Sequence, residues 1–285
     1  MACKVVVNCD SGNATRLDLD KLLNMLGCVD AEVQTIDSTT DWSAEGFDTV
    51  IVCGGDGTLH NAIGKCEGKQ IIYAPCGTLN ETSLTEDVVT TVGNVNGDLF
   101  SYVCAVGSFT EIGYTAKTRA KKIFKGIAYL PQVLKHYKCH QIHATLDVDG
   151  TKMSGEYTLL MILKSHRCFG FDFNRCYHKH KGLYLLAVNS VGEDGLVSRA
   201  KMFFPFFRVF FGGFSTPCSN LRYTLVPFDK LTVDLEQSFD FCLDGERRQL
   251  GPHLEFYEQS LDKQIPIVKT PLCKGFAKRR CKNEY

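Results

Sequence analysis

Apolar positions in the first third of the chain form short runs separated by turns and one helical repeat. Residues 50–53 are an apolar run typical of a buried parallel strand, residues 31–36 alternate as a strand does, and residues 4–8 and 70–74 are predicted as two further strands. A leucine-rich segment before Gly27 has helical spacing, and a second helix is expected to begin at Leu59. Because short connections between strands and helices favour a parallel sheet, we predict a Rossmann-like α/β domain over residues 1–96.

Beyond about residue 97 the pattern changes to strand-like runs of period two. They cover residues 99–106, 140–148, 155–163, 182–188, 221–226, 231–235 and 239–243. Two of them end in Asp-Gly pairs, at Asp149 and Asp244, and Asp-Gly is a strong signal for a hairpin turn. We therefore predict a mainly antiparallel β-sandwich domain over residues 97–259, with residues 260–285 free to pack back on the first domain. A basic helical segment is predicted over residues 115–137.

The segment from Met202 to Phe214 contains seven phenylalanines. It is too short to span a bilayer, for which about 20 apolar residues are needed. Two interpretations remain: a buried helix or connection between sheets, or an apolar patch that inserts into the membrane interface. Basic residues near it and in two further clusters either meet anionic headgroups or face solvent. These residues are Arg199, Lys201 and Arg208, then Lys117, Arg119, Lys121, Lys122 and Lys125, then Lys274, Lys278, Arg279, Arg280 and Lys282.

Composition narrows the class of protein without identifying it. Of 285 residues, 44% are hydrophobic and 22% charged, as in ordinary globular proteins. Lys plus Arg equals Asp plus Glu at 32 each, and nothing in this balance predicts binding to nucleic acid. The 14 cysteines include no CxxC pair, the N-terminus lacks the features of a signal peptide, and no apolar stretch approaches 18 residues. We therefore expect a cytoplasmic protein with reduced thiols.

The glycine-rich turn after residues 50–53 carries the strongest chemical signal. It consists of Gly54, Gly55, Asp56, Gly57 and Thr58. Glycines let backbone amides approach a ligand closely, and the N-terminus of the following helix favours anions. The Asp56 carboxylate is suited to a metal ion or a hydroxyl proton, so the turn predicts a phosphate site. The alternative is a tight strand–helix turn that binds nothing. A second loop, residues 75–82, would border the same crevice.

Five residues form the densest group of soft-metal ligands in the chain. They are His166, Cys168, Cys176, His178 and His180. Tetrahedral zinc sites normally show close ligand pairs on both sides of a loop, and this spacing fits no common zinc motif. A polar loop that lines the entrance for a substrate is therefore favoured over a zinc site.

Several motifs in order resemble the diacylglycerol kinase catalytic family, in particular its small bacterial soluble members. Residues 54–58 resemble the GGDGT loop of that family, and residues 77–81 resemble its GTxND loop. Residues 107–110 with 121–130 are similar to the segment that opens its second domain. Residues 193–196 resemble its NDGLL stretch, residues 244–246 its DGE, and residues 8–12 its first NPxSG loop.

This resemblance implies a two-domain lipid kinase with its active site in the cleft between the domains. Such an enzyme transfers the γ-phosphoryl group of ATP to a lipid hydroxyl, such as that of diacylglycerol, with Mg²⁺ as cofactor. It would act on its lipid partner at the membrane surface, through peripheral contact by residues 202–214 and the basic tail. The expected nucleotide-binding residues are Asn8, Gly54, Gly55, Asp56, Gly57, Thr58, Thr78, Asn80 and Glu81.

The resemblance also suggests catalytic and metal-binding roles. Glu246 is the candidate general base for the lipid hydroxyl, and Asp56 is the candidate ligand of the catalytic Mg²⁺. Asp244 would align the Glu246 turn or support the metal site. A second, structural metal site is implied around Val191, Asp194 and Leu196, where Asp194 supplies the only charged side chain.

Three departures from the family pattern keep other functions open. Leu59-His60-Asn61-Ala62 replaces the usual continuation of GGDGT, Cys9 stands where proline is expected, and Glu81 replaces aspartate. A NAD kinase, which shares the GGDGT loop and the two-domain arrangement, is one alternative. A nucleotide- or lipid-binding homologue with weak or no catalysis is the other. The sequence leaves open whether the protein is a homodimer.

Overall fold

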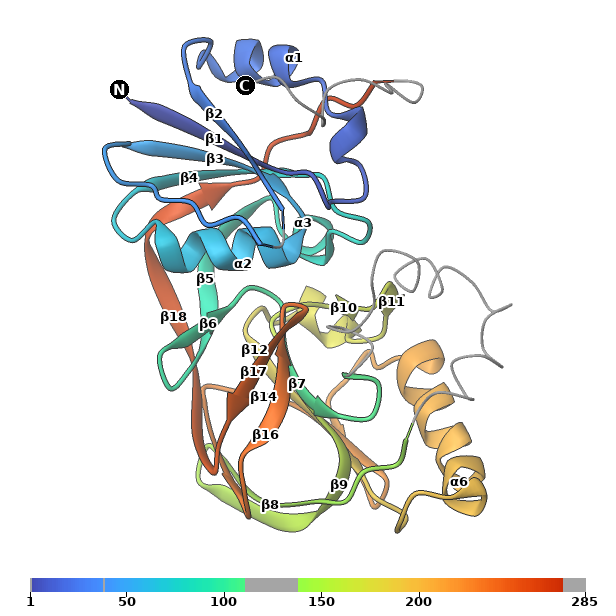
Figure 1. Ribbon diagram of the computed structural model, residues 1–285. Coiled ribbons are helices and arrows are strands. Elements are labelled where there is room, and N and C mark those ends of the chain that lie inside the picture. Colours follow the sequence, from blue (N-terminus) through green and yellow to red (C-terminus); the bar gives the residue numbers. More distant parts are fainter. Residues whose placement is uncertain (1, 38, 111–137, 274–285) are drawn as a thin grey trace. The chain divides into compact units, whose positions relative to one another are not determined.

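The computed structural model describes residues 2–37, 39–110 and 138–273 (Figure 1). Contacts divide the chain into two compact units, Met1–Thr91 with Ser260–Tyr285, and Val92–Gln259. We call them unit 1 and unit 2. The boundary predicted near residues 95–98 falls at the turn between two strands of unit 2. The basic helix predicted over 115–137 with its cluster from Lys117 to Lys125, the motif at 121–130 and the C-terminal basic cluster lie outside the described residues.

Unit 1 contains a parallel four-stranded sheet in the order β2-β1-β3-β4. Every residue of the central strand β3 is buried, which explains its uninterrupted apolar sequence. The elements of this unit are β1 (Cys3–Asn8), η1 (Ala14–Arg16), α1 (Leu19–Leu26), β2 (Glu32–Ile36), β3 (Thr49–Gly54), α2 (Asp56–Lys65), β4 (Gln70–Pro75) and α3 (Glu81–Thr85). The predicted parallel α/β fold is therefore confirmed.

Helix α1 shows how local sequence signals set the bounds of an element in unit 1. The Asp18 carboxylate caps its first turn by accepting a hydrogen bond from the amide of Lys21 at 3.2 Å. Gly27 ends it in the left-handed conformation, with φ of 67°, where a side chain would be strained. Between these ends, Leu22 and Leu23 are buried in the core that also contains residues of β1 and β3.

Unit 2 is built on a large antiparallel sheet. Its strands follow the order β13-β14-β12-β9-β8-β15-β18-β5-β6, and β7, β16 and β17 continue from the second half of β9. The strands are β5 (Val88–Val95), β6 (Asp98–Phe100), β7 (Val103–Gly107), β8 (Ile142–Val148), β9 (Thr151–Leu163), β12 (Leu183–Asn189), β13 (Cys218–Ser219), β14 (Tyr223–Phe228), β15 (Lys230–Leu235), β16 (Phe239–Leu243), β17 (Glu246–Leu250) and β18 (His253–Pro266). The predicted mainly antiparallel β-fold is confirmed.

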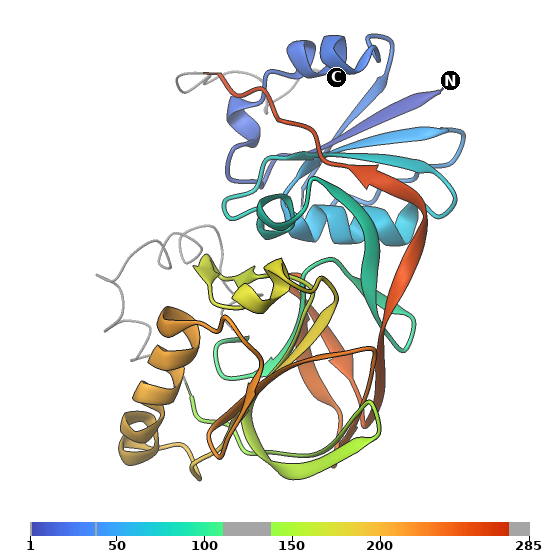
Figure 2. The same ribbon diagram turned by 180° about the vertical axis from the view of Figure 1, so that it is seen from behind.

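Alternate residues of β9 and β12 enter two different cores. Leu160 and Leu185 belong to the core that the curled sheet surrounds, whereas Met161 and Leu186 belong to a second core on the opposite face. The second face is covered by α6 (Leu196–Phe207) and the π-helical turn η4 (Arg208–Gly212). Figure 2 shows α6 alongside the sheet of unit 2. No helix among the described residues is long and apolar enough to cross a membrane.

The structure differs from the predicted strands in one interrupted run and in several strands that were not predicted. The run at 99–106 is interrupted at residues 101 and 102, because a buried carboxylate from another hairpin accepts their amides in place of a partner strand. Strands β5, β17 and β18 were not predicted. Both β5 and β18 carry the chain from one unit to the other, and β18 has charged and apolar residues without strict alternation.

Candidate active site

The turn between β3 and α2 has the geometry of an anion site. Gly55 precedes α2 without a side-chain cap, and its carbonyl accepts the amides of Thr58 at 3.0 Å and Leu59 at 3.1 Å. Within the described part of the chain, the amide of Gly57 donates to no protein group. An unengaged amide at the positive end of a ten-residue helix favours a negatively charged ligand.

Gly54 and Asn8 bring two strand ends together around Thr58. A Cβ on Gly54 would overlap the Thr58 side chain, so this position needs glycine for close packing. The Nδ2 group of Asn8, at the end of β1, donates to Thr58 Oγ1 at 2.9 Å. The hydroxyl of Thr58 is buried and remains able to donate its own proton. Three of the predicted nucleotide-binding residues therefore form one contact group.

Asp56 links the glycine turn to the loop after β4. Its side chain is almost buried, and its Oδ2 and Oδ1 atoms accept the amides of Glu81 at 2.8 Å and Thr82 at 3.0 Å. The carboxylate therefore stabilises the first turn of α3, whose amides lack intrahelical partners. A carboxylate oxygen can hold a hard cation as well as accept hydrogen bonds, so these contacts do not exclude a metal-binding role for Asp56.

The loop from Gly77 to Glu81 packs against both other loops. The amide of Gly77 donates to Gly54 O at 3.1 Å, and the Gly77 carbonyl accepts the Nδ2 groups of Asn13 and Asn80. A Cβ on Gly12 would overlap the hydroxyl of Thr78, which places the first loop against the third.

Asn80 and Glu81 complete this loop. Asn80 has a left-handed backbone with φ of 51°, a conformation that asparagine tolerates better than most residues. Its Oδ1 atom is buried and accepts no hydrogen bond from the described residues, which suits a ligand donor. The Glu81 side chain is fully buried at the start of α3. Unit 1 thus brings the nine predicted nucleotide-binding residues onto three adjoining loops.

Glu246 and Asp244 lie in unit 2, on the hairpin between β16 and β17. The two turn residues, Asp244 and Gly245, have φ of 50° and 96°, as a tight hairpin turn requires. Asp244 is buried and accepts hydrogen bonds at 2.5–3.0 Å from the amides of residues 101–103 and the Ser101 hydroxyl. Of its two suggested roles, the contacts support alignment of the turn. Glu246 itself is exposed.

The residues suggested for a second metal site do not present a free carboxylate. Both oxygens of Asp194 bind the Arg199 guanidinium, at 2.9 and 2.6 Å, and Oδ1 also accepts the amide of Cys139 at 2.9 Å. The Arg199 hydrogen bond is the main cause that lowers the pKa of Asp194 to about 2. The side chain of Leu196 points into solvent. A cation here would compete with Arg199, so the donor set does not fit Mg²⁺ well, and the Val191, Asp194 and Leu196 site stays a prediction.

Comparison with known proteins supports the motif-based resemblance. Residues 3–95 match the family model described as the diacylglycerol kinase catalytic domain. A diacylglycerol kinase from Bacillus subtilis (strain 168) is 23% identical over 149 residues, which cover 44% of this chain and 49% of that protein. One from Staphylococcus carnosus (strain TM300) is 24% identical over 156 residues, covering 45% of this chain and 49% of that protein. The chain thus spans about half the length of the curated relatives it matches.

A solved structure extends the similarity of fold. A crystal structure of a diacylglycerol kinase from Bacillus anthracis (strain Sterne) has a TM-score of 0.59 at 16% identity, and covers 95% of this chain and 97% of that one. At this identity the match concerns the fold alone. The resemblance to the diacylglycerol kinase catalytic family is therefore confirmed, by sequence over residues 3–95 and by fold along nearly the whole chain.

Proposed function

We propose that this protein is an ATP-dependent lipid kinase that transfers the γ-phosphoryl group to a lipid hydroxyl, such as that of diacylglycerol. The observation that carries the proposal is the contact group of three loops in unit 1. There a glycine turn, an unengaged helix amide and a buried carboxylate meet within a segment of diacylglycerol kinase catalytic type. Phosphoryl transfer depends on positioning and charge neutralisation, and such loops supply both.

The residues of unit 1 would divide the binding of the triphosphate between them. The amide of Gly57 and the Thr58 hydroxyl would donate to phosphate oxygens, and the Thr78 hydroxyl would do so from the adjoining loop. The buried Oδ1 of Asn80 would accept a donor of the nucleotide. Bound at Asp56, Mg²⁺ would neutralise the phosphate charge. Glu246 would accept the proton of the lipid hydroxyl as general base.

A phosphotransfer assay tests the proposal directly. The full chain is offered γ-labelled ATP with diacylglycerol, a sphingoid base, phosphatidylglycerol or NAD as acceptor. We expect label in a lipid, because the family match concerns diacylglycerol kinases. Label in NAD alone would replace the proposal by a NAD kinase. Nucleotide binding without transfer to any acceptor would favour the non-catalytic homologue.

The phenylalanine-rich segment has two faces with different exposure. Phe206, Phe210 and Phe214 are buried in the second core of unit 2, as expected for a helix that covers a sheet. Phe204 and Phe207 are 70% and 46% exposed. The interpretation as a helix that covers a sheet therefore describes one face, and membrane contact by the exposed face stays a prediction.

We further propose that the exposed face of α6 contacts the surface of the membrane that holds the lipid acceptor. Leu196 and Val197, at 87% and 67% exposed, extend the apolar surface of Phe204 and Phe207. Of the basic residues predicted to meet headgroups, Lys201 is exposed on the same helix. Arg208 is also exposed, although its guanidinium carbon lies 4.8 Å from the ring centre of Phe214. The apolar face, more than local charge, would drive this contact.

Replacing Phe204 and Phe207 together by serine is expected to weaken binding to lipid vesicles by about 100-fold or more, because each buried phenylalanine side chain contributes about 1.5–3 kcal/mol. Sedimentation with vesicles measures the partition. Met25→Ser, which removes an exposed apolar side chain of unit 1, is the control and should bind as the unmodified protein does. Equal binding by all three proteins would contradict this role for α6.

Replacing Phe206 and Phe210 together by serine should instead lower the free energy of unfolding, since those two rings belong to the second core of unit 2.

A further inference from the structure

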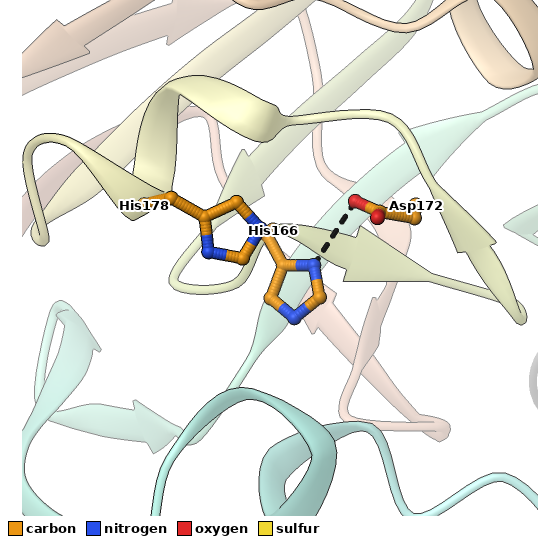
Figure 3. A group of neighbouring side chains, drawn as sticks. All are labelled: His166, Asp172 and His178. Carbon is orange, nitrogen blue, oxygen red and sulfur yellow. Dashed lines mark hydrogen bonds and ion pairs between the residues drawn. The ribbon is translucent and has the colours of Figure 1, made fainter.

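Three possible metal ligands meet on the loop that joins β9 to β12 in unit 2. The loop contains the short strands β10 (Arg167–Cys168) and β11 (Phe171–Asp172) and the 3-10 helix η3 (Arg175–His178). Side-chain atoms of His166, Asp172 and His178 all lie within 4.8 Å of one another. Figure 3 shows the ring of His166 between the Asp172 carboxylate and the ring of His178. Two of the histidines noted in the sequence, His166 and His178, therefore lie together in the structure, beside an aspartate that the sequence pattern did not indicate.

The cysteines of the same sequence group lie elsewhere. Cys168 and Cys176 are buried in the second core of unit 2, among apolar side chains. The buried Cys176 thiol donates to the Phe214 carbonyl at 3.5 Å. The ligands that remain available are therefore imidazole nitrogens and a carboxylate oxygen, without sulfur.

The backbone of this loop is held in a defined shape. The fully buried Asn174 donates its amide to His166 O at 2.9 Å and its Nδ2 group to Ser165 O at 3.1 Å. It also accepts the amide of Tyr177 at 3.2 Å. Arg167 pairs with Asp172 across the β10–β11 ladder. These hydrogen bonds hold the backbone on both sides of the ligands. They favour metal binding, because less conformational entropy is lost when the ion binds.

The distances require only a modest closure around an ion. Ligand atoms on a tetrahedral zinc ion lie about 3.3 Å apart, given bonds of about 2.0 Å. His166 Nδ1 and Asp172 Oδ1 lie 3.0 Å apart in a hydrogen bond whose proton a metal ion would replace, and the rings of His166 and His178 have centroids 4.4 Å apart. His166 is buried, whereas Asp172 and His178 are exposed, so the two exposed side chains can rotate toward the fixed one.

We propose that His166, Asp172 and His178 form a binding site for a divalent transition-metal ion such as Zn²⁺. Imidazole nitrogen with one carboxylate suits zinc, cobalt and nickel, whereas Mg²⁺ prefers oxygen ligands alone. Three ligands leave at least one position of a tetrahedral ion for water, and two of the three side chains are open to solvent. This site is independent of the proposed kinase reaction and uses none of its residues.

Another histidine of unit 2 shows why proximity to carboxylates is insufficient. His253 uses Nδ1 to contact Asp234 at 2.6 Å and Nε2 to contact Glu255 at 3.7 Å. Its partners are on opposite ring nitrogens, so no single point is close to all three groups. His253 therefore offers a matched control: an exposed histidine beside carboxylates that is not expected to bind the ion.

Cobalt titration of the tag-free full chain under reducing conditions tests this site. We expect one Co²⁺ per chain, with d–d bands in the visible spectrum and no thiolate charge-transfer band. His178→Ala should weaken binding by about 10- to 100-fold or more, since even loss of an outer-shell partner costs that much. Asp172→Asn should act in the same direction, and His253→Ala should leave binding unchanged. Zinc competition then gives the zinc affinity of each variant.

Two results would overturn the assignment. One is equal cobalt affinity in the unmodified protein and in His178→Ala, with thermal melts showing both folded. The other is a spectrum dominated by thiolate ligands, which would place the metal at cysteines. Nitrogen shifts of the histidine side chains on addition of Zn²⁺ provide an independent readout, and they should move for His166 and His178 but not for His253.

Discussion

Glu246→Gln is expected to lower kcat for lipid phosphorylation by about 100- to 10,000-fold, the usual effect of losing a general base. Glutamine keeps the size of the side chain but cannot accept the hydroxyl proton. Glu246 is exposed and lies opposite Leu243 in the β16–β17 hairpin, so its replacement removes no buried contact. The free energy of unfolding should therefore stay within about 0.5 kcal/mol of the unmodified value.

Initial-rate assays with labelled ATP, run beside urea denaturation curves, separate chemistry from stability in this variant. Glu236→Gln is the matched control, because it changes another exposed carboxylate of unit 2. The control should retain full activity. If Glu246→Gln also turned over normally, the proton acceptor would have to be another group. The anchoring of the hairpin by Asp244 would then serve stability alone.

Strands β1, β3 and β4 of unit 1 were predictable because most of their residues are buried, whereas the edge strand β2, which is partly exposed, was predictable from its alternation. Buried strands need continuous apolar runs, as in β3, and glycine or polar residues mark their ends. In unit 2, β9 and β12 were predictable for the same reason, since their two faces enter two cores. Strand β18 was not predicted, because much of it is exposed and its charged residues interrupt the alternation of apolar and polar positions.

The glycine loops of the site were predictable, but the bonds between them were not. Glycine, threonine and aspartate at the end of an apolar run predict a ligand-binding turn from local sequence. The capping of α3 by Asp56 depends on how two loops 25 residues apart meet, which no local pattern encodes. For the same reason Asp172 was missed as a partner of His166 and His178, since a carboxylate in a polar loop has no distinctive spacing.

Asp56→Asn and Asp56→Ala are expected to reduce kcat by at least about 100-fold and to differ in stability. Alanine leaves the amides of Glu81 and Thr82 buried without an acceptor, at a cost of about 1–3 kcal/mol each, or about 2–6 kcal/mol together. Asparagine keeps one acceptor oxygen and should lose less stability. Both remove the negative charge that Mg²⁺ would require. Activity should therefore fall equally in the two variants, while stability should not.

This difference separates the two roles of the carboxylate. If Asp56 were only a cap, activity measured well below the unfolding temperature would follow the folded fraction, and the asparagine variant would work almost normally. Asp18→Ala provides the control for capping alone, because Asp18 caps α1 in the same unit and its loss should cost about 1 kcal/mol without affecting turnover. Near-normal turnover in Asp56→Asn would therefore assign the metal to a different ligand, while the same loss in both variants would tie catalysis to the charge at this position.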